Sequence, residues 1–138
     1  MQRTTQSPVA LLLIAVALAC GCSRQKTLAD RFSHANRAIV VDRTDSNVTM
    51  PLTGEETRNL LRAISASRKE SPLIEASAQL RIEFFKGTNF LGAVEASGVG
   101  VFGVDGVPYS DRSGVLQTLA TKFSQEQAAR KSTNTPAR

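Results

Sequence analysis

The sequence is poor in the residues on which many catalytic and metal sites are built. It contains two cysteines, Cys20 and Cys22, and one histidine, His34. A nucleophilic serine or cysteine needs a neighbouring base, usually histidine, and a zinc site needs about four ligands. A disulfide between two cysteines that are one glycine apart would connect no distant parts of the chain. We therefore expect no metal, no cofactor and no enzymatic activity.

Aromatic residues are also scarce, at 5% of the chain with no tryptophan, and the positive charge is dispersed. The formal net charge is +5, but residues 71–111 carry two basic and five acidic residues, whereas residues 112–138 carry five basic residues and one acidic residue. Nucleic-acid binding favours basic residues that cluster on one element, with aromatic side chains among them. The basic ends instead indicate solvated tails, or a weak attraction to anionic lipids. We expect no nucleic-acid partner.

A phosphate-binding loop is missing as well. Gly98, Gly100 and Gly103 alternate with valine and phenylalanine, and no lysine ends this glycine-rich run. A phosphate loop needs that lysine at the start of a helix. The pattern indicates flat or bulged strands instead.

The chain has one long hydrophobic run, the 11 residues Val9–Ala19. It is too short to cross a bilayer, which takes about 20 residues. Arg3 precedes it, no acidic residue occurs before Asp30, and the small-residue pattern Ala17-Leu18-Ala19 ends it. These features are typical of a secretory signal peptide, which we place at residues 1–19.

The next residues, Cys20-Gly21-Cys22-Ser23, resemble the lipobox of bacterial lipoproteins. In that family a small residue precedes an obligatory cysteine, which becomes the first mature residue and carries a diacylglyceryl thioether. The resemblance covers residues 1–22 and implies Cys20 as the lipid-attachment site, with Cys22 as the alternative. Two or three acyl chains anchor a protein stably, because each buried methylene contributes about 0.8 kcal/mol. Cleavage after Ala19 without lipidation would instead release a soluble periplasmic or secreted protein.

The resemblance also implies a location in the cell envelope, with the membrane as partner through the N-terminal lipid. Neither cysteine is followed by aspartate, the residue that retains such lipoproteins at the inner membrane of diderm bacteria, so the outer membrane facing the periplasm is favoured. We expect residues 20–36 to hold the lipid-attachment site and a tether, residues 37–124 to form one domain, and residues 125–138 to form a polar, partly disordered tail.

The periodicity of residues 37–124 predicts an α+β domain. Thr53 and Glu56 form a capping box before one helix, and Ser113 is expected to cap a second. Alternating or β-branched stretches predict strands near residues 38–41, 48–50, 80–85, 90–96, 99–104 and 107–109. Short connections favour antiparallel pairing. We expect a two-layer sandwich, with an antiparallel sheet of about four to six strands and two helices on one face.

The favoured function is a non-catalytic interaction module. Simple alternation places Phe85 and Leu91 on the sheet face opposite Phe84 and Phe90. The helices would cover one face, so Phe85 and Leu91 could form a small apolar patch on the other. Such a patch, or an edge strand, could bind an envelope protein or peptide.

The alternative function is a small envelope hydrolase that uses Asp105, Tyr109 and Asp111. Two carboxyl groups that converge on a substrate can act as general acid and base. However, Asp105-Gly106 also predicts a tight hairpin turn, and Asp111 lies where the last helix should begin. The hydrolase requires that the two carboxyl groups meet in a pocket.

Overall fold

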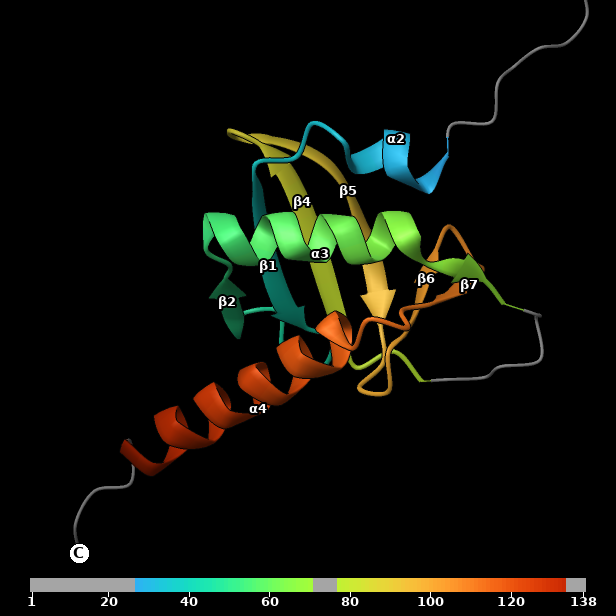
Figure 1. The fold of residues 1–138 in the computed structure, drawn as a ribbon. Coiled ribbons are helices and arrows are strands. Elements are labelled where there is room, and N and C mark those ends of the chain that lie inside the picture. Colours follow the sequence, from blue (N-terminus) through green and yellow to red (C-terminus); the bar gives the residue numbers. More distant parts are fainter. Residues whose placement is uncertain (1–26, 71–76, 134–138) are drawn as a thin grey trace, which may run out of the picture.

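Seven strands form one antiparallel sheet in the residues that the computed structural model describes, 27–70 and 77–133 (Figure 1). The spatial order of the strands is β2-β1-β4-β5-β6-β7-β3. Their bounds are β1 Arg37–Asp42, β2 Thr49–Pro51, β3 Arg68–Lys69, β4 Leu80–Lys86, β5 Asn89–Ala96, β6 Val101–Val104 and β7 Val107–Ser110. The helices are α2 (Leu28–Phe32), α3 (Gly54–Ala66) and α4 (Val115–Thr133).

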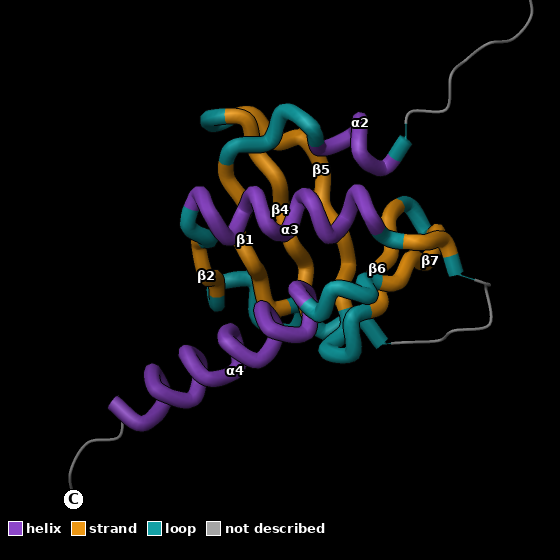
Figure 2. Tube along the Cα trace, in the orientation of Figure 1, coloured by secondary structure: helices purple, strands orange, loops and turns teal. Residues whose placement is uncertain are grey.

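The helices form a second layer on one side of this sheet (Figure 2). Helix α3 crosses the face, α2 covers one end of it, and the first half of α4 closes the other end. The predicted α+β sandwich is therefore confirmed. The sheet has one strand more than the upper end of the predicted range, because the two-residue β3 pairs with β7. So short a segment shows no periodicity in the sequence.

Local sequence signals explain several of these elements. Thr53 accepts a hydrogen bond from the Glu56 amide at 3.2 Å, and the Glu56 carboxylate accepts one from the Thr53 amide at 2.8 Å. The predicted capping box thus starts α3. At the β6–β7 turn, Asp105 and Gly106 have φ values of 50° and 77°, as a type I′ hairpin requires.

Helix α4 is longer than the sequence pattern suggested. Leu116, Leu119 and Phe123 are buried in the core, as expected for the apolar face of this helix. The helix then continues to Thr133 with mostly exposed side chains and projects beyond the sheet, although Gln127 still donates a hydrogen bond to Asp42 of β1 at 3.2 Å (Figure 1). Residues 125–133, which were assigned to a polar tail, are therefore helical.

The packed structure also begins earlier than residue 37. Phe32 of α2 is only 1% exposed, and its ring lies 4.6 Å from the ring of Phe84, centroid to centroid. A Cβ on Gly92 of β5 would lie 3.1 Å from Phe32 Cε1, so glycine provides the space for the ring. Residues 28–36 had been assigned to the tether because they lack periodicity, but the buried Phe32, together with the hydrogen bonds of Asn36 to the β4–β5 hairpin, fixes them to the domain.

Replacement of Phe32 tests whether α2 belongs to the folding unit. We expect Phe32→Ala to lower the free energy of unfolding by about 3–5 kcal/mol, because it removes a fully buried ring. Phe90, which is 54% exposed, provides the matched control, and Phe90→Ala should change stability by less than about 1 kcal/mol. Urea denaturation measures both. Equal, small losses would show that α2 is dispensable for folding.

Candidate interaction surface

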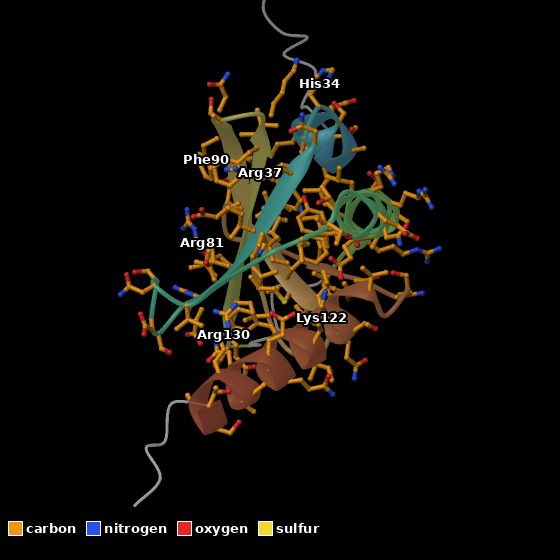
Figure 3. All side chains as sticks on the ribbon, turned by 90° about the vertical axis from the view of Figure 1, so that its left-hand side faces the viewer. His34, Arg37, Arg81, Phe90, Lys122 and Arg130 are labelled. Carbon is orange, nitrogen blue, oxygen red and sulfur yellow. The ribbon has the colours of Figure 1, made fainter. Side chains whose placement is uncertain are left out.

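We call the sheet face opposite α3 the open face, because no helix of the described chain crosses it. Its residues come mainly from β1, β4, β5 and β6. In the side view, Phe90 and Arg81 lie on this face, away from α3 (Figure 3). The open face therefore presents side chains that the core does not use.

An aromatic pair lies at one end of the open face. The rings of Phe85 and Phe90 meet edge to face, with centroids 5.7 Å apart. The Arg37 guanidinium lies over the Phe85 ring, 4.6 Å from its centroid, within the range of a cation–π interaction. We call Phe85, Phe90 and Arg37 the aromatic end.

This arrangement corrects the prediction for Leu91. The register shifts between Phe84 and Phe85, so that Phe85 pairs with Phe90 while Phe84 pairs with Gly92. Leu91 is the extra residue of this β-bulge, and it is half-buried and packs against the core. Phe85 lies on the open face as expected, but its neighbour there is Phe90. The two-residue turn Gly87-Thr88 already implied this pairing, because it fixes the register next to the turn.

A network of charges occupies the centre of the open face. Arg81 Nε lies 3.0 Å from Glu83 Oε1, and Arg81 Nη1 lies 3.3 Å from Glu95 Oε1. Arg43 Nε lies 3.2 Å from Glu95 Oε2, close enough for an ion pair but without hydrogen-bond geometry. We call these four residues the charged centre. Their signs alternate, so the centre carries no net charge.

A shallow hollow of about 470 Å³ lies between the charged centre and the β6–β7 turn. Its lining includes Arg81, Glu95, Phe90 and Ala93. Arg31 of α2 closes one side through a bidentate contact with Asp105, in which Nη2 lies 3.2 Å from Oδ1. The hydrogen bond from Arg31 lowers the pKa of Asp105. The hollow is open to solvent and has both polar and apolar walls.

The structure does not bring Asp105, Tyr109 and Asp111 together. Asp105 lies in the turn before β7 and Asp111 follows the end of that strand, so about 20 Å of extended chain separates them. Tyr109 stacks on Phe102, with centroids 5.5 Å apart and an interplanar angle of 18°. Each of the three side chains has a structural contact of its own, and they share no pocket.

Asp111 caps the start of α4, a role that sequence analysis had given to Ser113. Its carboxylate accepts hydrogen bonds from the amides of Leu116 at 2.9 Å and Ser113 at 2.8 Å. Burial alone would raise the pKa of Asp111, but the hydrogen bonds from Leu116 and Ser113 outweigh it and lower the pKa. Asp111 therefore has a structural role at the start of α4 and is not positioned to act as a general acid.

The remaining predicted residues contribute no chemistry to this surface. His34 is exposed in the loop between α2 and β1. Among residues 27–70 and 77–133, no three histidine, cysteine or acidic side chains lie close enough to share a metal ion. Within the same ranges, no helix has the length and hydropathy of a membrane span. Cys20, Cys22 and the predicted signal peptide lie outside the described residues.

Comparison with known proteins gives no relative from which a role could be transferred. No family model matches the chain, and no curated protein or solved structure is similar enough to count as a match. The open face must therefore be interpreted from its own chemistry.

The role of Asp111 as a helix cap has a pH-dependent consequence. We expect Asp111→Asn to lower the stability at pH 7 by about 1 kcal/mol, because the charged acceptor of two amides is lost. The pKa of Asp111 is lowered on folding, so its contribution is present above the unfolded value near 4 and is lost as the pH falls through the lower, folded value. Urea titrations at pH 7 and pH 3 measure the difference.

The wild type should therefore lose more stability than the variant between these two pH values. Glu55→Gln, at an exposed position in the first turn of α3, is the control and should change stability by less than about 0.5 kcal/mol at pH 7. Parallel losses in wild type and Asp111→Asn on acidification would contradict the capping role.

Proposed function

We propose that the protein is an exported, lipid-anchored envelope protein that acts as a non-catalytic binding module. The anchor is supported by the sequence alone: a short apolar run followed by Cys20 and Cys22. The chain would be attached through Cys20, with the domain facing the periplasm. An anchored domain of this kind works by holding a partner at the membrane.

The observation that carries the binding function is the open face. A two-layer domain needs helices on one side of its sheet only, and the other side of this sheet is chemically diverse. It combines an alternating charge network with a hollow of about 470 Å³. The charged centre offers alternating donors and acceptors for the side chains of a protein or peptide from the envelope, with the hollow beside them.

The edges of the sheet are less suited to binding a partner by strand addition. The outer strand β2 has three residues and ends at Pro51, which has no amide hydrogen to donate. The outer strand on the other side, β3, has two residues. Strand addition needs a longer row of free backbone groups. The side chains of the open face are therefore the better candidate surface.

The mass of the mature N-terminus tests the anchor. We expect the purified membrane form to begin at Cys20 and to carry a diacylglyceryl group, with precursor accumulating when lipoprotein processing is blocked by a globomycin-type inhibitor. Cys20→Ala should abolish the modification, while the matched variant Cys22→Ala should retain it. A mature chain that begins at residue 20 without lipid would support the soluble periplasmic alternative and contradict the anchor.

Site-specific photo-crosslinking in cells tests the binding surface. A photoreactive amino acid at Ala93, beside the charged centre, should capture one discrete envelope protein or peptide. The same group at the exposed Gln117 of α4 should not capture it. Arg81→Glu should weaken the crosslink from Ala93, because it reverses a charge of the proposed contact. Equal products from both positions, or no effect of Arg81→Glu, would exclude the open face as the specific surface.

A further inference from the structure

The aromatic end of the open face lies at the same end of the molecule as α2. The Asn36 side chain, in the loop after α2, accepts a hydrogen bond from the Gly87 amide at the β4–β5 turn, at 2.9 Å. The Asn36 amide donates to the Phe85 carbonyl, also at 2.9 Å. Figure 3 shows His34, Phe90 and Arg37 toward one end of the domain and Arg130 at the other.

The length of chain before α2 limits how far this end can lie from a lipid anchor. Cys20 and Thr27, the N-cap of α2, are seven residues apart in the sequence. Even a fully extended chain advances about 3.3–3.6 Å per residue, so the anchored cysteine and α2 would be at most about 25 Å apart. A lipid anchor at Cys20 would therefore keep the α2 end within about 25 Å of the bilayer, whereas α4 projects from the opposite end of the domain (Figure 1).

The side chains at this end match the chemistry of an anionic membrane surface. Phe90 is 54% exposed beside Phe85. Arg37 and Lys86 are exposed, and no acidic residue of the described chain lies within ion-pair distance of either. The acids of α2, β4 and the β6–β7 turn have partners of their own: Asp30 accepts hydrogen bonds from Thr27, Asp105 pairs with Arg31, and Glu83 pairs with Arg81. The exposed end thus combines an aromatic ring with two cations.

We propose that the aromatic end and Lys86 dock on the bilayer to which the protein is anchored, with Phe90 in the interface and Arg37 and Lys86 near anionic headgroups. This inference rests on the lipid anchor proposed above. Aromatic rings favour the headgroup level of a bilayer, and cations near an anionic surface strengthen binding. Docking would hold the domain in one orientation and leave the charged centre at the side, accessible to a partner.

The absence of tryptophan makes this orientation measurable. The full lipidated chain with Phe90→Trp is reconstituted in phosphatidylethanolamine–phosphatidylglycerol vesicles that contain brominated acyl chains. We expect quenching of the single tryptophan, whereas Ala129→Trp, on the projecting part of α4, should remain unquenched. Replacing Arg37 and Lys86 by Gln in the Phe90→Trp chain should lower the ratio of docked to undocked domain roughly fivefold per charge. Urea denaturation confirms that each variant folds.

The outcomes separate this inference from the anchor. If mass spectrometry finds lipid on the chain but the tryptophan at position 90 is quenched no more than the one at position 129, the docking proposal fails and the anchor stands. An emission shift that depends on protein density and not on brominated lipid would show that a second copy covers the surface, and it would also overturn docking. A chain without lipid on either cysteine would overturn both proposals.

Discussion

The contact between Phe32 and Gly92 determines much of this structure. The ring fills the space above a residue that lacks a side chain, and it packs against Phe84 beneath it. Gly92 has a φ of 152°, a conformation that residues with side chains rarely adopt, and it belongs to the β-bulge of β5. This irregular position therefore helps to fix α2 to the sheet. The bulge also changes the side of the sheet on which the preceding side chains lie, so that Phe90 lies on the open face.

The elements that could be predicted from the sequence are those with local signals. The capping box of Thr53 and Glu56, the Asp105-Gly106 turn and the apolar side of α4 each depend on residues a few positions apart. The elements that could not be predicted depend on distant contacts. Strand β3 exists because β7 provides a partner, and α2 is ordered because Phe32 reaches the core.

The candidate surface shows the same division. Phe85 could be placed on the outer face because β4 alternates regularly, whereas Leu91 could not be placed by alternation because the bulge inserts one residue into β5. The position of Asp111 before α4 already suggested a structural role. Its two amide hydrogen bonds explain why a carboxylate is present there. The charge network was missed because Arg81 and Glu95 become neighbours only when β4 and β5 pair.

The short outer strands have a consequence for the protein at high density. Copies of a β-protein that are crowded on a surface risk joining through unpaired edges, which is the first step toward fibrils. Here one edge ends at a proline and the other is two residues long, so neither offers a template for continued growth. The sheet can thus expose a broad face to its surroundings without becoming a seed for aggregation.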